Sequence, residues 1–220
     1  MKAIVFDLDG VLVDSEPVWE QVRRRYVEEH GGTWRDDTQH RLMGMSTAEW
    51  AHYLSAELGV DRTPEQVAAE VVDEMARRYA EAVPLIDAAV PVVRRLAARW
   101  PLGVASSSPG RLIEAALEAA GLTDVFRVAR SSEQVPRGKP APDVYLAAAA
   151  GLGEDPAHCA AVEDSSNGVR SAAAAGMRVV AIPHAAYPLA DDAAALASVT
   201  LTSIDELTDK TIEALDSPPG

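Results

Sequence analysis

Five short apolar segments recur along the chain, and polar residues follow most of them directly. The segments are rich in strand-forming residue types and cover Ala3–Phe6, Leu102–Ala105, Phe126–Ala129, Cys159–Val162 and Val179–Ile182. Short apolar runs of this kind are typical of strands buried on both faces of a parallel sheet. Ala- and Leu-rich stretches that predict helices lie between the later segments, at 111–120, 143–150 and 169–175, and a glycine follows each of them. This alternation predicts an α/β fold with a doubly wound parallel sheet.

Residues 16–84 interrupt the alternation because they contain no convincing strand. Pro17 favours a helix that extends through His30. Residues 63–66 have the spacing of a capping box at a helix N-terminus. Apolar side chains then follow at helical spacing, namely Val67, Val71, Met75 and Tyr79. We therefore predict an all-helical insert at 16–84, placed after the first strand of a core that consists of 1–15 and 85–220.

Composition and charge exclude several kinds of partner. The 220 residues carry 34 acidic and 20 basic side chains, a formal net charge of −14 at pH 7. A chain this acidic is not expected to bind nucleic acid or an anionic membrane surface. No stretch is apolar enough to cross a bilayer or to form the apolar part of a signal peptide before Asp7. With Cys159 as the single cysteine, we expect a cytoplasmic monomer that binds a small molecule.

Reactive side chains follow four of the predicted strands. They are Asp7 and Asp9 after the first strand, Ser106 after the second, Lys139 in the loop after the third, and Glu163 with Asp164 after the fourth. Each alone has an ordinary explanation as a turn, a helix cap or a solvated charge. The carboxyl ends of parallel strands share one edge of the sheet, however, and open α/β sheets bind ligands there. We therefore expect these residues to form one site.

The set is suited to phosphoryl transfer, which needs charge neutralisation and in-line positioning. Carboxylate oxygens of Asp7 and Asp164, with a backbone carbonyl, are suitable ligands for Mg²⁺. Asp7 could then attack phosphorus, while Asp9 protonates the leaving oxygen and later takes a proton from water. The Ser106 hydroxyl would hold phosphoryl oxygens, and Lys139 would offset their negative charge.

Four segments carry a resemblance to a known family. Phe6-Asp7-Leu8-Asp9-Gly10, Ala105–Ser108, Gly138–Asp143 and Val162–Gly168 are similar, in this order, to the motifs of the haloacid dehalogenase superfamily. The resemblance covers essentially the whole chain. It implies a Rossmann-like core with a helical cap that determines substrate specificity. We accordingly expect metal ligands at Asp7, Asp9, Glu163 and Asp164, and substrate contacts at Ser107, Ser108, Trp19, Met43, Gly44 and Thr47.

Within the superfamily, the chain most resembles the β-phosphoglucomutase-like subgroup, and there sugar phosphatases such as 2-deoxyglucose-6-phosphatase. Val13–Trp19 and Ser107-Ser108-Pro109 carry this similarity. Three departures from the mutases favour hydrolysis. The segment 43–47 has no Lys or Arg for a second phosphate, Pro109-Gly110 replaces their Lys-Asn, and Trp19 replaces their histidine linked to Asp9. We therefore expect a Mg²⁺-dependent phosphatase of sugar phosphates that works through an aspartyl phosphate. Trp19 and the segment 43–47, which are largely apolar and uncharged, would lie over a neutral leaving group.

Other functions remain open at this point. A phosphomutase would need the missing cap cations. A dehalogenase, in which the aspartate attacks carbon without a metal, would not need Asp9 or Asp164. A phospho-accepting signalling module of the receiver type uses a similar set of residues, but the helical insert argues against it. A non-catalytic binding protein would leave the catalytic set idle. Nothing in the cap side chains specifies which sugar is bound.

Overall fold

Six parallel strands form the sheet at the centre of the molecule, in the order β3-β2-β1-β4-β5-β6. The computed structural model describes residues 1–43 and 45–216. The strands are β1 (Ala3–Phe6), β2 (Leu102–Ser106), β3 (Phe126–Ser131), β4 (Cys159–Glu163), β5 (Arg178–Ala181) and β6 (Val199–Thr200). The predicted α/β fold with a doubly wound parallel sheet is thus confirmed. The two-residue edge strand β6 was not predicted, because so short a segment has no periodic pattern to detect.

Strand β1 is a continuous apolar run because it lies at the centre of the sheet and is buried on both faces. It pairs with β2 on one side and β4 on the other, and none of its four side chains is exposed. Ile4 and Phe6 belong to the apolar cluster on one face, whereas Ala3 and Val5 belong to the cluster on the opposite face. A strand that must be apolar on both faces cannot alternate with polar residues. Residue 7 is therefore the first position after β1 where a charge can stand.

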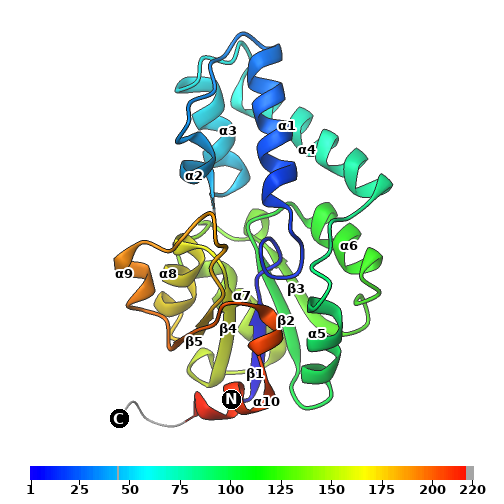
Figure 1. Cartoon of the computed structure of the whole chain (residues 1–220), viewed down its shortest axis with the longest axis vertical. Helices are drawn as coiled ribbons and strands as arrows, with labels where there is room; N and C mark the ends of the chain where they lie inside the picture. Colours follow the sequence, from blue (N-terminus) through cyan, green and yellow to red (C-terminus); the bar gives the residue numbers. More distant parts are fainter. Residues whose placement is uncertain (44, 217–220) are drawn as a thin grey trace.

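Helices cover both faces of this sheet, as Figure 1 shows. They are α5 (Ala89–Ala97), α6 (Gly110–Ala119), α7 (Asp143–Leu152), α8 (Ser166–Ala174), α9 (Asp191–Ala194) and α10 (Asp209–Ala214). Helix α7 corrects one predicted boundary, because it continues through Gly151 and ends at Leu152. The residue with the left-handed conformation that ends the helix is Gly153, with φ of 74°.

Four further helices lie between β1 and β2, beyond the carboxyl ends of the strands (Figure 1). They are α1 (Glu16–Glu29), α2 (Thr38–Leu42), α3 (Thr47–Ala56) and α4 (Pro64–Glu81). The predicted capping box is present, with the Thr63 side chain accepting a hydrogen bond from the backbone N–H of Gln66. The predicted apolar stripe of α4 is buried as well. Among the described residues of this segment, none belongs to a strand of the sheet.

Two chain segments connect these four helices to the sheet, and they run side by side. The backbone N–H of Asp14 donates to the carbonyl of Pro84 at 2.8 Å, and that of Ile86 donates to the carbonyl of Leu12 at 3.0 Å. Val13 and Leu85 form an antiparallel bridge between them. The four helices are thus attached through one narrow double connection that lies beside the carboxyl end of β1.

None of the helices within residues 1–43 and 45–216 has the length and apolar character that crossing a membrane requires.

Candidate active site

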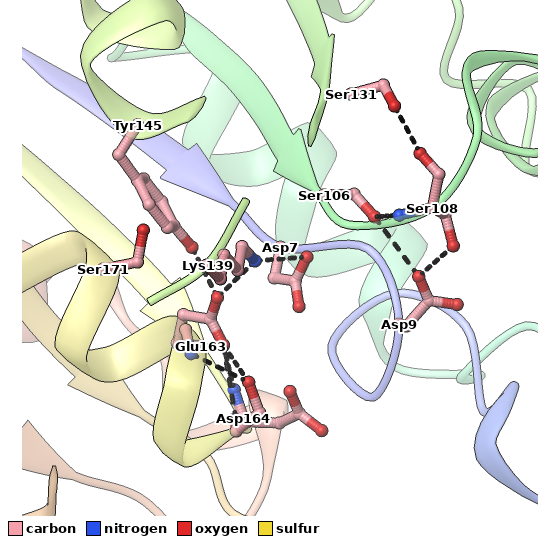
Figure 2. A network of polar contacts seen from close by, with 12 residues as sticks. Asp7, Asp9, Ser106, Ser108, Ser131, Lys139, Tyr145, Glu163, Asp164 and Ser171 are labelled. Carbon is pink, nitrogen blue, oxygen red and sulfur yellow. Dashed lines mark hydrogen bonds and ion pairs between the residues drawn. The ribbon is translucent and has the colours of Figure 1, made fainter. Parts of the chain in front are cut away.

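The side chains predicted to form one site come together at the carboxyl ends of β1, β2 and β4 (Figure 2). Asp7 follows β1 directly, Ser106 is the last residue of β2, and Glu163 is the last residue of β4. Lys139 comes from the loop before α7. Parallel pairing of the three strands therefore converts residues about 100 positions apart into neighbours, as expected from the topology.

A buried lysine lies between two carboxylates. The Lys139 side chain is 1% exposed, and its Nζ atom lies 3.0 Å from Oδ1 of Asp7 and 2.5 Å from Oε1 of Glu163. Burial alone lowers the pKa of Lys139, but the Asp7 and Glu163 carboxylates outweigh it and raise that pKa above its ordinary value. Lys139 therefore keeps its positive charge beside Asp7 at any physiological pH.

The Glu163 carboxylate is fixed by donors on both oxygens. Its Oε1 atom accepts from Lys139 and from the Tyr145 hydroxyl at 2.7 Å. Its Oε2 atom accepts from the backbone N–H groups of Asp164 at 3.1 Å and Ser165 at 3.3 Å, and from the Ser165 hydroxyl at 3.2 Å. A Cβ atom at Gly168 would overlap with this carboxylate, so a glycine is required there. Glu163 thus holds Lys139 at a fixed place next to Asp7.

Asp7, Glu163 and Asp164 form a buried acidic cluster in which one oxygen of each lies within 4.8 Å of the others. Burial, and next the Glu163 charge, raise the pKa of both Asp7 and Asp164 well above the ordinary aspartate value. The single charge of Lys139 cannot neutralise three carboxylates. Oxygen ligands with excess negative charge are what Mg²⁺ and other hard divalent cations require, so the cluster fits such a metal. A Cβ atom at Gly10 would overlap with the Asp164 carboxylate, which explains the glycine next to the cluster.

Asp9, the fourth predicted metal ligand, directs its carboxylate away from this cluster (Figure 2). Oδ1 accepts from the Ser15 hydroxyl at 2.5 Å and from Nε1 of Trp19 at 3.4 Å. Oδ2 accepts from the hydroxyls of Ser108 at 2.7 Å and Ser106 at 3.3 Å. The structure therefore brings Asp7, Glu163 and Asp164 together as expected, but it places the Asp9 carboxylate in a separate network of hydroxyl donors.

The three consecutive serines at the carboxyl end of β2, Ser106 to Ser108, have different positions. Ser106 is fully buried; its hydroxyl donates to Asp9 and accepts from the backbone N–H of Ser108 at 2.9 Å. Ser107 and Ser108, in contrast, line a cavity next to Asp7. The serines that face the cavity are thus the two predicted substrate contacts, whereas Ser106 supports Asp9.

The cavity lies between the carboxyl ends of the strands and the helices α1 to α3. Its wall on the sheet side includes Asp7, Asp9, Ser107, Ser108, Lys139 and Asp164, and its wall on the helical side includes Glu16, Trp19, Arg23, Leu42, Met45 and Trp50. The predicted contact Trp19 is therefore in place. Met43 lines a neighbouring cavity instead, Thr47 lines neither of the two, and Gly44 lies outside the described residues.

Glu16 and Arg23, two charged residues in the wall on the helical side, were not among the predicted site residues. Both residues lie on the same face of α1 as Trp19, at positions separated by three and four residues. That spacing was the available signal. It identifies a shared face, but only the position of α1 in the folded chain shows that this face borders the cavity.

A measurable consequence of the acidic cluster is the pH dependence of stability without metal. The folded-state pKa values of Asp7 and Asp164 are raised, so their contribution to stability is complete below about pH 4 and is lost as the pH rises through the folded-state values. We expect the Tm of the metal-free protein to fall as the pH increases above 4. Added Mg²⁺ should raise the Tm, and by more at pH 8 than at pH 5, because binding requires ionised carboxylates. Differential scanning fluorimetry with EDTA or Mg²⁺ measures both effects.

The variant that tests the metal site is Asp164→Asn. Its control is Asp155→Asn, because Asp155 caps a short helix at 156–158 that is distant from the cluster. Asp164→Asn removes one buried charge, so it should raise the Tm in EDTA at pH 8 and lose most of the increment caused by Mg²⁺. An increment equal to that of the unmodified protein would exclude Asp164 from the metal site.

The fold and this site define a class of protein, and comparisons with known proteins agree. The family model for haloacid dehalogenase-like hydrolases matches residues 1–176. Hexitol phosphatase B of Escherichia coli K12 is 35% identical over 215 residues, which cover 94% of this chain and 95% of that protein. The fructose-1-phosphate phosphatase of the same organism is 31% identical, covering 80% of this chain and 94% of that protein. The crystal structure of β-phosphoglucomutase from Clostridium difficile superposes with a TM-score of 0.84 over 98% of this chain and 96% of that chain, at 20% identity.

The class is therefore that of α/β enzymes with an acidic site at the carboxyl ends of a parallel sheet. The chain belongs to the haloacid dehalogenase-like hydrolases. The predicted resemblance to this superfamily and the predicted fold are thus confirmed. The predicted class of enzyme is confirmed as well, since the two Escherichia coli relatives named above are phosphatases.

Proposed function

We propose that this protein is a Mg²⁺-dependent phosphatase that hydrolyses phosphorylated sugars or polyols through a covalent intermediate on Asp7. The observation that carries the proposal is the position of the Asp7 carboxylate. It lies at the carboxyl end of the central strand, 3.0 Å from a buried ammonium group and within a buried acidic cluster, and it borders the cavity. The names of the relatives support a phosphorylated sugar or sugar alcohol as substrate.

The metal would be held by Asp7 and Asp164, with Glu163 beside them. When bound, it supplies positive charge that offsets the charge of the phosphate and of the carboxylates. Lys139 contributes a second positive charge next to Asp7. These charges are needed because a carboxylate and a phosphate dianion repel each other at the distance of attack.

Asp7 attacks phosphorus, and the bond between phosphorus and the leaving oxygen breaks. Asp9 gives its proton to that oxygen, so the product is a neutral alcohol. Asp9 then accepts a proton from a water molecule, whose oxygen attacks the phosphorus of the aspartyl phosphate. Inorganic phosphate leaves and Asp7 is regenerated. Ser15 and Ser108 hold the Asp9 carboxylate throughout by hydrogen bonds of 2.5 and 2.7 Å.

Residues 16–84 act as a cap over the leaving group in this proposal. The cavity has a volume of about 40 Å³, which is room for only a few water molecules. A sugar phosphate needs several times this space, so the four helices must move away from the sheet for substrate to enter. The double connection at Val13 and Leu85 is where such a movement would occur.

A phosphate-release screen tests the proposal. In Mg²⁺ we expect release of inorganic phosphate from sugar and sugar alcohol phosphates. In EDTA this activity should fall at least 100-fold, and it should recover when Mg²⁺ is restored. Absence of turnover with every monophosphate would contradict a phosphatase. A stable phosphorylated protein would indicate the receiver-type alternative, and interconversion of sugar phosphates without release would indicate a mutase.

A further inference from the structure

Arg23 lies in the cavity wall formed by α1, and the proposed chemistry does not use it. The residue is 5% exposed. Its guanidinium carbon lies 4.3 Å from the ring centroid of Trp19 and 4.9 Å from that of Trp50. The two indoles therefore fix the guanidinium in position by cation–π contacts.

One hydrogen-bond donor of this guanidinium, at Nε, is not used by the protein. Within the part of the chain that the structure describes, the buried Nε atom has no partner and no carboxylate lies within ion-pair distance of Arg23. Burying a charged donor without a partner is costly. The arrangement is reasonable if a ligand in the cavity supplies the missing acceptors.

A carboxylate borders the cavity on the same face of the helix. Glu16 precedes Arg23 by seven positions, two helical turns, and both line the cavity together with Asp9. Nε2 of Gln39 donates to Oε2 of Glu16 at 2.5 Å, which fixes the carboxylate. The wall thus offers a fixed acceptor and a fixed set of donors, both outside the acidic cluster at Asp7.

We propose that Arg23 and Glu16 form a subsite that binds two neighbouring hydroxyl groups of the leaving group, so that the substrate is a phosphate ester of a polyol or sugar with a vicinal diol. The inference rests on the proposed phosphatase function. A diol matches the pair, because one hydroxyl can donate to the carboxylate while the other accepts from the guanidinium. Trp19 and Trp50 provide an apolar wall for the carbon chain between them.

The surrounding charges argue against a second phosphate or a carboxylate as the ligand. Such an anion would pair with Arg23, but it would also face the carboxylates of Glu16 and Asp9 across the same small cavity. The cavity wall holds four carboxyl groups, of Asp7, Asp9, Glu16 and Asp164, against the two cations of Arg23 and Lys139. A neutral ligand with hydroxyl groups avoids this repulsion and still satisfies the donors.

The test compares kcat/KM for three compounds: sorbitol 6-phosphate, which carries vicinal diols, n-hexyl phosphate, which carries none, and fructose 1,6-bisphosphate, which carries a second phosphate. In Arg23→Met, which keeps an unbranched side chain between the indoles, we expect a loss of about 100-fold for sorbitol 6-phosphate and a loss at least tenfold smaller for n-hexyl phosphate. Arg23→Lys should recover part of the loss. Glu16→Gln should lower the sorbitol 6-phosphate value about tenfold.

Arg25→Gln is the matched control, because Arg25 lies on the same helix but is exposed and pairs with Glu29. It should leave all three values unchanged. Equal losses for all compounds in Arg23→Met, or no loss, would overturn the subsite, as would a selective loss for fructose 1,6-bisphosphate. Failure of the phosphatase proposal itself looks different, since the unmodified protein would then release no phosphate from any of the three compounds. A Tm within a few degrees of the unmodified protein establishes that each variant is folded.

Discussion

Replacement of Asp7 by asparagine is expected to abolish turnover, with a loss of about 10,000-fold or more in kcat, which corresponds to about 5 kcal/mol in the barrier. The amide has the same shape, but it lacks the charged oxygen that attacks phosphorus, and it is a poorer metal ligand. The structure gives this residue no substitute. Glu163 accepts hydrogen bonds on both oxygens, and the Asp9 carboxylate is held by serines away from the cluster.

Asp14→Asn is the control, because Asp14 is exposed and lies seven residues further along the same segment. It removes the same charge without touching the cavity and should keep full activity. Rapid acid quench during turnover should trap the unmodified protein with a phosphate group attached to Asp7. The Asp7→Asn variant, treated in the same way, should carry no phosphate group. Full turnover by Asp7→Asn would exclude Asp7 as the nucleophile, whatever its Tm.

Replacement of Lys139 by alanine is expected to have the second largest effect. We expect kcat/KM to fall by about 1,000-fold, and the free energy of unfolding to fall by about 3–5 kcal/mol, because the change leaves two buried carboxylates without their cation. Oε1 of Glu163 and Oδ1 of Asp7 both lie within 3.0 Å of the ammonium in the unmodified protein. The two effects can be separated by assaying well below the Tm of the variant at saturating Mg²⁺.

Lys139→Arg tests the shape of the cation. A planar guanidinium is larger than an ammonium and must fit into a fully buried space. Lys139→Arg should therefore be more stable than Lys139→Ala but should have less than a tenth of the activity of the unmodified protein. Arg137→Ala is the matched control in the same loop, since Arg137 is exposed and pairs with Asp143. If Lys139→Ala were as active as this control, Lys139 would have no part in catalysis.

The residues of the sheet edge could be predicted from the sequence because the signal there is local. A buried strand such as Ala3–Phe6 is uniformly apolar, so its end is visible as the first charged residue, and parallel topology then brings the strand ends together. The same logic identified Glu163 and Asp164. The sequence therefore contained most of the fold and the reacting side of the site.

The other side of the site depends on features that are not local. Arg23 looks like an ordinary charged residue of a surface helix, next to the exposed Arg24 and Arg25. It is buried only in the folded chain, where Trp19 of α1 and Trp50 of α3 lie against its guanidinium. The direction of the Asp9 carboxylate was equally hidden. It depends on donors from residues 15, 106 and 108, which no short segment contains together.

The double connection at Val13 and Leu85 has a consequence for the history and engineering of such chains. The two connecting segments are hydrogen-bonded to each other. A tight turn could therefore join them directly, and the register of β1 with β2 and β4 would not change. A segment whose two ends already meet can be exchanged, lengthened or removed as one piece. Under the proposed function, in which residues 16–84 contact the leaving group, exchange of this piece should change substrate selectivity while the groups at the sheet edge stay in place.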